Sequence, residues 1–178
     1  MSSTAWARML DLAGIVGDSI VDGPGIRTTI FCQGCPHHCE GCQNPETWEF
    51  GCGTPMEAER ILEIVKSNRL CRGVTFSGGE PFAQAAGYAR LARLLKAAGY
   101  EVASYSGYTF EQLLKGTPAQ RELLETIDVL IDGPFLLAER TLEAPFRGSR
   151  NQRIIDVPKS LAAGEAVLVT AKRWLGEY

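Results

Sequence analysis

Apolar and polar residues along the chain follow two alternating patterns, one typical of strands and one typical of helices. Short apolar runs indicate strands at 10–16, 26–32, 74–76, 102–105, 127–131, 154–157 and 166–169. Between them, apolar residues recur at the i, i+3, i+4, i+7 spacing of an amphipathic helix. The two clearest sets are Ala58, Ile61, Leu62 and Val65, then Tyr88, Leu91, Ala92 and Leu95. This alternation predicts an α/β fold with a mostly parallel sheet and helices on the outside.

Polar residues mark the expected ends of several helices. Threonine followed three residues later by glutamate or glutamine is the pattern of a capping box, and it occurs at 54–57, 109–112 and 117–120. Pro55 would take the first helical position of the first of these helices. Gly99 follows an apolar periodic stretch and suits a helix C-terminal cap.

The composition is ordinary for a globular protein and narrows the function classes. With 178 residues, 45% of them hydrophobic and 22% charged, the chain is expected to form a single domain, 1–178, with a proper core. A net charge of −3 gives no basic footprint for nucleic acid. No apolar stretch approaches the ~20 residues that a membrane span requires. Six cysteines without an export signal predict a cytoplasmic protein that uses thiols as metal ligands.

Four cysteines lie close together in the pattern Cys32-x2-Cys35-x3-Cys39-x2-Cys42. Thiolates bind both zinc and iron–sulfur clusters, and four of them could close a structural zinc site. Cys32, however, ends a β-branched and aromatic run that predicts a strand, so it is expected in the core or behind the ligands. The other three lie in a loop with glycine and proline. The spacing therefore favours a three-thiolate iron–sulfur site over zinc.

A glycine turn, Ser77-Gly78-Gly79-Glu80-Pro81, follows the predicted strand at 74–76. Without Cβ atoms, Gly78 and Gly79 allow the backbone to approach a ligand closely. The alternative is a plain strand-to-helix turn in which the Glu80 charge suits the helix dipole. If the strands are parallel, this turn and the cysteine loop open at the same end of the sheet.

The triad Cys35-x3-Cys39-x2-Cys42 resembles the signature of the radical S-adenosylmethionine (SAM) superfamily. Within that superfamily, segments 22–27, 44–48, 106–110 and 147–153 resemble the glycyl-radical-enzyme activases, in particular the subgroup that acts on an anaerobic ribonucleotide reductase. The resemblance covers about 15–157. One departure is Gly41, because many superfamily members carry an aromatic residue at this position.

The resemblance implies a shortened partial (β/α) barrel of the radical SAM type. It also implies that Cys35, Cys39 and Cys42 hold a [4Fe–4S] cluster whose fourth iron binds SAM. The residues expected to contact SAM are Gly41 and Gln43 beside the third cysteine, Gly78, Gly79 and Glu80 at its amino-acid end, and Ser104 as a ribose candidate. The reduced cluster would cleave SAM, and the resulting radical would take a hydrogen from a glycine of the partner enzyme. The chain itself would supply binding and orientation.

Three further expectations concern partners and alternatives. The family implies a flavodoxin or ferredoxin as the electron donor. An activase for another glycyl-radical enzyme, such as a formate-lyase, is the second hypothesis. The third is a non-catalytic zinc or ferredoxin-like module that uses all four clustered cysteines.

Several other polar residues have two interpretations each. His37 and His38 are expected as partly exposed loop residues rather than ligands, and Cys52 and Cys71 as structural thiols. Asp132-Gly133 is a turn or lies near a SAM or cation site. The three arginines of 147–153 form a docking patch, a contact to the SAM carboxylate or a solvated turn; they are Arg147, Arg150 and Arg153.

Overall fold

The computed structural model describes residues 8–177, which form one seven-stranded sheet with its helices and loops. The strands are β1 Met9–Ser19, β2 Arg27–Cys32, β3 Thr54–Glu57, β4 Gly73–Gly78, β5 Glu101–Tyr105, β6 Val129–Asp132 and β7 Arg153–Asp156. The α-helices are α2 Ala58–Ser67, α3 Ala85–Ala97, α4 Phe110–Leu114, α5 Pro118–Thr126 and α6 Val157–Ala163. Short 3₁₀ turns lie at η1 Pro45–Thr47, η2 Pro81–Gln84, η3 Leu137–Glu139 and η4 Lys172–Leu175.

The strand order is β3-β1-β2-β4-β5-β6-β7. The central strands β2, β4, β5 and β6 run parallel, whereas β1, β3 and β7 join at the two sides through antiparallel pairs. The prediction of an α/β fold with a mostly parallel sheet is confirmed. Strands β3 and β7 end the strand order and do not pair with each other among the described residues, so the sheet is open, as expected for a shortened barrel.

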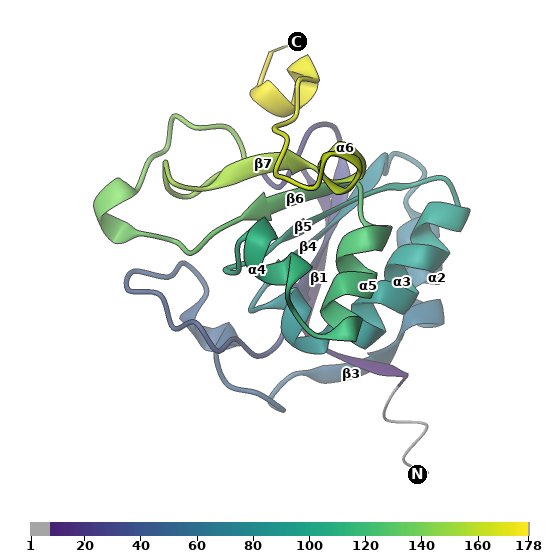
Figure 1. Cartoon of the computed structure of the whole chain (residues 1–178). Helices are drawn as coiled ribbons and strands as arrows, with labels where there is room; N and C mark the ends of the chain where they lie inside the picture. Colours follow the sequence, from purple (N-terminus) through teal and green to yellow (C-terminus); the bar gives the residue numbers. More distant parts are fainter. Residues whose placement is uncertain (1–7, 178) are drawn as a thin grey trace.

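The helices α2, α3 and α5 pack side by side on one face of the sheet (Figure 1). The larger core lies between these helices and the sheet, and its helical members include the predicted apolar positions of α2 and α3. The other face carries a smaller apolar cluster, to which no α-helix of the described structure contributes, formed by Ala103, Val129, Ile131, Ile154, Val169 and Trp174. Among the described residues, no helix is long and apolar enough to cross a membrane.

Two predicted helix starts and one helix end are confirmed. Thr109 and Thr117 each accept a hydrogen bond from the third residue of the helix that follows, and the glutamine there bonds back, which completes both capping boxes. Gly99 has a φ of +92° just after α3, a conformation that glycine adopts without steric cost.

Two predicted elements are wrong. Segment 54–57 is not the first turn of a helix but strand β3, because Leu10 and Asp11 of β1 pair with Met56 and Pro55, and the helix begins only at Ala58. Proline is tolerated there because β3 is an edge strand. Segment 166–169 is not a strand of the sheet, since it forms only an isolated bridge between Leu168 and Ile155.

Candidate functional site

The three cysteines of the triad lie in one loop, residues 33–53, which we call the cysteine loop. It leaves the C-terminal end of β2 and returns to the sheet at β3 (Figure 1). Its base is closed by backbone hydrogen bonds from Gly34 N to Thr47 O at 2.7 Å and from Cys35 N to Trp48 O at 3.1 Å. The buried Gln33 amide adds bonds to two further carbonyls of the loop. The loop is therefore a folded unit rather than a free segment.

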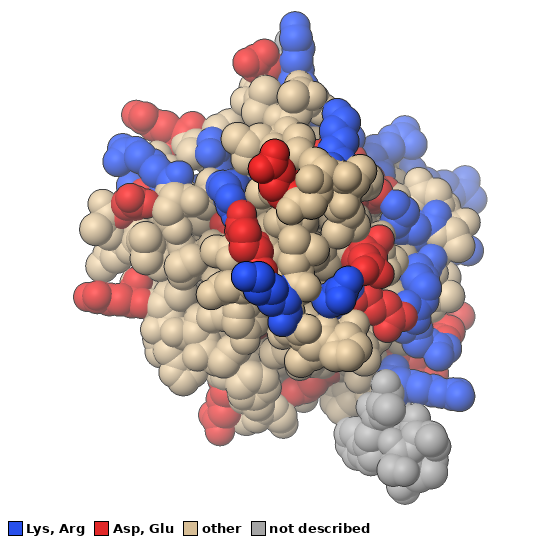
Figure 2. Space-filling view, viewed as in Figure 1, with Lys and Arg blue, Asp and Glu red and all other residues tan. Residues whose placement is uncertain are grey.

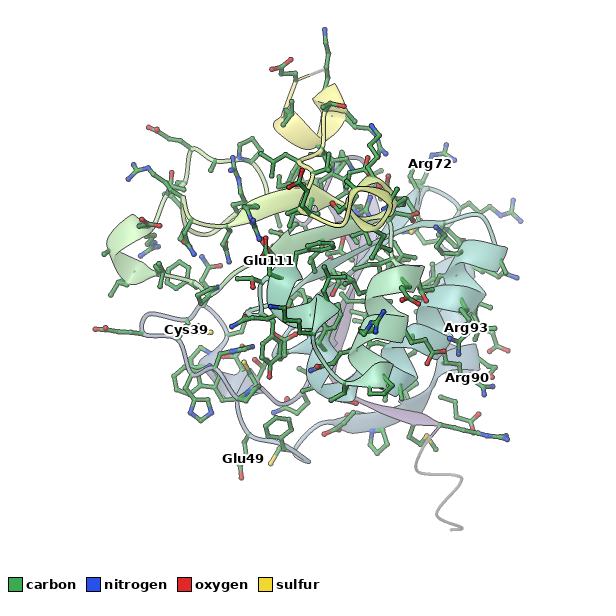
Figure 3. The ribbon with its side chains drawn as sticks, viewed as in Figure 1. Cys39, Glu49, Arg72, Arg90, Arg93 and Glu111 are labelled. Carbon is green, nitrogen blue, oxygen red and sulfur yellow. The ribbon has the colours of Figure 1, made fainter. Side chains whose placement is uncertain are left out.

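Cys35, Cys39 and Cys42 are partly exposed free thiols, and Figure 3 shows Cys39 on this loop at the side of the molecule. The backbone N–H of Asn44 lies 3.4 Å from the Cys42 sulfur. Burial raises the pKa of Cys35, and hydrogen bonds from the backbone of His37 and His38 oppose that rise. Backbone N–H groups directed at sulfur suit thiolates that hold an iron–sulfur cluster. The donor set thus fits, although among the described residues no three His, Cys, Asp or Glu side chains are already gathered as metal ligands.

Cys32 has a different environment from the other three. It is fully buried at the end of β2, where its sulfur accepts a hydrogen bond from Gln84 Nε2 at 3.2 Å. Burial raises its pKa to about 12, so the neutral thiol is strongly favoured. This is the core position that its strand-end location predicted.

The glycine turn lies against the base of the cysteine loop. Gly78 pairs with Cys32 across the parallel strands β4 and β2, and Glu80 N donates to Gly34 O at 2.8 Å. A Cβ on Gly79 would lie 2.2 Å from Gly34 O, so only glycine fits this contact. The expectation that both loops open at one end of the sheet is confirmed.

Glu80 is fully buried, and its carboxylate already accepts four hydrogen bonds from the chain. Oε1 accepts from Phe82 N and Ser106 Oγ, both at 3.0 Å. Oε2 lies 2.7 Å from Gly107 N and 2.8 Å from His37 Nε2. A ligand that contacted this carboxylate would have to displace one of these donors. No local signal in the sequence predicts the contacts with His37, Ser106 and Gly107, because these residues are far from Glu80 along the chain.

The remaining residues predicted to contact SAM occupy different environments. Gly41 and Gln43 are exposed beside Cys42. Gly41 has a φ of +75°, which favours glycine. A Cβ there would lie 2.8 Å from Leu137 Cδ1 of η3, so glycine also allows the loop between β6 and β7 to approach the cysteine loop. Ser104 is fully buried within β5, and its hydroxyl donates to Tyr105 O, which favours the interpretation as a satisfied strand hydroxyl.

The segment 147–153 holds the loop between β6 and β7 together. Gln152 accepts from Gly148 N at 2.8 Å and donates to Gly133 O, while Asn151 donates to Pro134 O at 2.7 Å. Arg153 pairs with the buried Asp132 and with Glu111, which Figure 3 labels near the start of α4. Hydrogen bonds to these two carboxylates raise the pKa of Arg153 further above its usual range. The ion pair between Arg153 and Asp132 thus accounts for both residues by a role in holding the structure together. Arg150, in contrast, is exposed to solvent.

The segment 22–27 lies at the opposite end of β2 from the cysteine loop. Its Arg27 is almost fully buried and donates to Thr75 Oγ1 at 2.9 Å, to Glu101 Oε1 at 3.0 Å and to Val74 O at 3.1 Å. Asp22 accepts from the hydroxyls of Ser19 and Thr29. These contacts give the segment a role in holding the sheet together rather than in the site.

Charges are unevenly distributed around the site. Figure 2 shows Lys and Arg side chains gathered over α2 and α3, whereas the surface toward the cysteine loop carries few charges in this view.

Comparison with known proteins identifies the class. Residues 21–155 match a family described as a 4Fe-4S single cluster domain. The match contains the cysteine loop, the glycine turn and the central strands that bring them together. The fold and site are thus those of a protein with a single [4Fe–4S] cluster.

Relatives narrow the class further. The "anaerobic ribonucleoside-triphosphate reductase-activating protein" of Pasteurella multocida is 39% identical over 145 residues, covering 76% of this chain and 90% of the relative. The chain belongs to the family of these activating proteins. A "pyruvate formate-lyase-activating enzyme" of Clostridium pasteurianum is 38% identical over 107 residues, but this match covers only 55% of this chain and 45% of that enzyme. Among solved structures, the crystal structure of QueE from Escherichia coli gives a TM-score of 0.47 at 18% identity, over 61% of this chain and 57% of that one.

Proposed function

We propose that this chain is a radical SAM activase, a single domain that generates a glycyl radical on an anaerobic ribonucleoside-triphosphate reductase. The observation that supports the proposal most strongly is that a loop with three thiols and a glycine turn contact each other at the C-terminal ends of the neighbouring parallel strands β2 and β4. Ligands of open α/β sheets bind at this position. The relatives, of which this chain covers most of the length, support the same activity.

The proposal assigns Cys35, Cys39 and Cys42 to a [4Fe–4S] cluster. In this scheme the backbone around Gly78 and Gly79 receives the amino-acid end of SAM, and Gly41 and Gln43 flank it from the cysteine loop. Ser104 is the weakest of the proposed ligand contacts because it is fully buried.

When bound, the cluster would supply the electron that splits SAM into methionine and a 5′-deoxyadenosyl radical. That radical would take a hydrogen atom from a glycine of the reductase, which would leave 5′-deoxyadenosine and the glycyl radical. The residues of the chain orient these groups and exclude water. The electron comes from a flavodoxin or ferredoxin in the cytoplasm, and nucleic acid and membrane take no part.

The test is an anaerobic assay of the reconstituted protein with SAM and dithionite, in which 5′-deoxyadenosine, iron, sulfide and zinc are measured together. We expect about four irons per chain, with formation of 5′-deoxyadenosine. Cys39→Ala should abolish both, whereas Cys52→Ala, a change of an exposed cysteine outside the triad, should leave both intact. Zinc without SAM cleavage would instead identify a structural metal module.

A second candidate is an activase for a pyruvate formate-lyase, which the Clostridium pasteurianum relative favours. The two candidates differ in their protein substrate. We expect the glycyl-radical signal in electron paramagnetic resonance with the anaerobic reductase and little with the formate-lyase. The opposite yields would overturn the assignment of the partner but not that of the chemistry.

A further inference from the structure

The carboxylate of Glu80 joins three segments that are distant in the sequence. His37 comes from the cysteine loop, Phe82 from the turn that follows Glu80, and Ser106 with Gly107 from the connection between β5 and α4. A buried carboxylate is costly unless hydrogen bonds compensate it, and here both oxygens have two donors each. Glu80 is thus the point at which the cysteine loop is attached to the sheet.

His37 fits closely into the position it occupies. A Cβ on Gly107 would lie 2.5–2.8 Å from atoms of the imidazole, so glycine is required for the ring to reach Glu80. The Tyr108 ring meets the imidazole edge to face, with 4.5 Å between centroids. The segment 106–110 therefore supplies both the donors to Glu80 and the space for His37. The adjacent His38 makes no such contact with Glu80: it is exposed and stacks on Trp48.

We propose that Glu80 and His37 are positioning residues that fix the cysteine loop for cluster binding, and that Glu80 acts through His37 rather than by touching SAM. His37 lies between Cys35 and Cys39, so the hydrogen bond from its Nε2 restrains the part of the loop that carries both thiols. Bonds to a charged group are among the stronger hydrogen bonds in proteins. The role of this pair in cluster binding rests on the proposed function.

Two variants of His37 separate the effect of its hydrogen bond to Glu80 from the effect of its ring packing on Tyr108. His37→Phe keeps a ring against Tyr108 but removes the donor, and His37→Gln keeps a donor without the ring. His38→Phe is the matched control in the same loop. The first measurement is the rate of iron loss from the reconstituted protein to a chelator.

We expect His37→Phe to lose iron about ten times faster, because loss of this hydrogen bond raises the population of the loosened loop, from which iron leaves, by about that factor. His37→Gln should recover most of the retention, and His38→Phe should match the unmodified protein. Glu80→Gln should also accelerate the loss, and the double variant His37→Phe/Glu80→Gln should be little worse than the worse single variant, because both changes remove the same contact.

A second measurement uses the protein without its cluster. Its result therefore does not depend on whether the protein cleaves SAM. We expect iodoacetamide to alkylate Cys39 faster in His37→Phe than in His38→Phe, at an unchanged unfolding midpoint. Equal alkylation of Cys39 in these two variants would overturn the positioning role. The role would also be wrong if Glu80→Gln weakened SAM binding while leaving iron retention intact, because Glu80 would then be a ligand contact. Failure of the proposed function is distinct, since the unmodified protein would not cleave SAM.

Discussion

At the scale of single residues, we expect substitution of Cys32 and substitution of a loop cysteine to have opposite effects on cluster retention. Cys32 is fully buried in the core and its raised pKa keeps it a neutral thiol, whereas Cys35, Cys39 and Cys42 are partly exposed. We expect Cys32→Ala to retain the cluster and to lower the free energy of unfolding by on the order of 1 kcal/mol, through lost packing and the lost bond from Gln84. Iron analysis and urea unfolding measure the two effects. A cluster lost from Cys32→Ala as completely as from Cys35→Ala would mean a four-thiolate site.

The sequence predicts residues well where the chemistry is local. The spacing of the cysteines and the double glycine are visible within a few positions, and the strand-like run before Cys32 correctly placed that residue in the core. The donors to Glu80 from His37, Ser106 and Gly107 were not predicted, because they come from segments that only the folded sheet brings together. Arg27 was missed for the same reason: its partners Thr75 and Glu101 lie on two other strands.

At the scale of elements, the contact between the glycine turn and the cysteine loop leads to a second prediction. A Cβ at Gly79 would meet backbone of the loop on two sides, at 2.2 Å from Gly34 O and 3.0 Å from Thr47 O. Backbone cannot rotate away as a side chain can, so Gly79→Ala should displace the cysteine loop. We expect loss of most of the iron with little change in the unfolding midpoint, measured by iron analysis and circular dichroism. The control is Gly14→Ala in β1, where nothing lies within 4 Å of the added carbon; equal iron in both variants would contradict the prediction.

The elements that the sequence predicted correctly are those defined by nearby residues. The capping boxes at Thr109 and Thr117 need only a glutamine three residues away, and both formed. The same pattern at 54–57 failed because pairing with β1 offers its backbone a ladder of hydrogen bonds, and tertiary pairing outweighs local preference. The apolar run at 166–169 failed because it follows the edge strand β7 for a single bridge only, so its hydrophobicity reflects cover of the sheet and not strand formation.

At the scale of the whole molecule, the sheet has a different cover on each face. Helices cover one face, and the other is closed near β5, β6 and β7 by loops and by the C-terminal turn η4. Trp174 of η4 is the largest fully buried side chain in the described structure. It packs edge to face on Phe146 with 5.5 Å between centroids, and the Arg27 guanidinium lies 5.3 Å from its ring centre. The C-terminal turn thus packs both against Arg27 at the start of β2 and against Phe146 in the loop between β6 and β7.

This arrangement predicts that stability and cluster binding can be lost separately. Trp174→Ala should lower the free energy of unfolding by about 3–5 kcal/mol, the usual cost of truncating a large buried aromatic residue. Trp174→Phe should cost much less, since it keeps a ring in the cluster and removes an indole N–H that has no hydrogen-bond partner among the described residues. Below the unfolding transition, iron per folded chain should be unchanged in both variants, because the residues that pack against Trp174 belong neither to the cysteine loop nor to the glycine turn. Urea unfolding and iron analysis on the same samples test this.

Loss of iron from folded Trp174→Ala would mean that the packing of the C-terminal turn is coupled to cluster binding. Loss of iron from Gly79→Ala at an unchanged unfolding midpoint would instead confirm that the cluster site depends on the contact between the glycine turn and the cysteine loop.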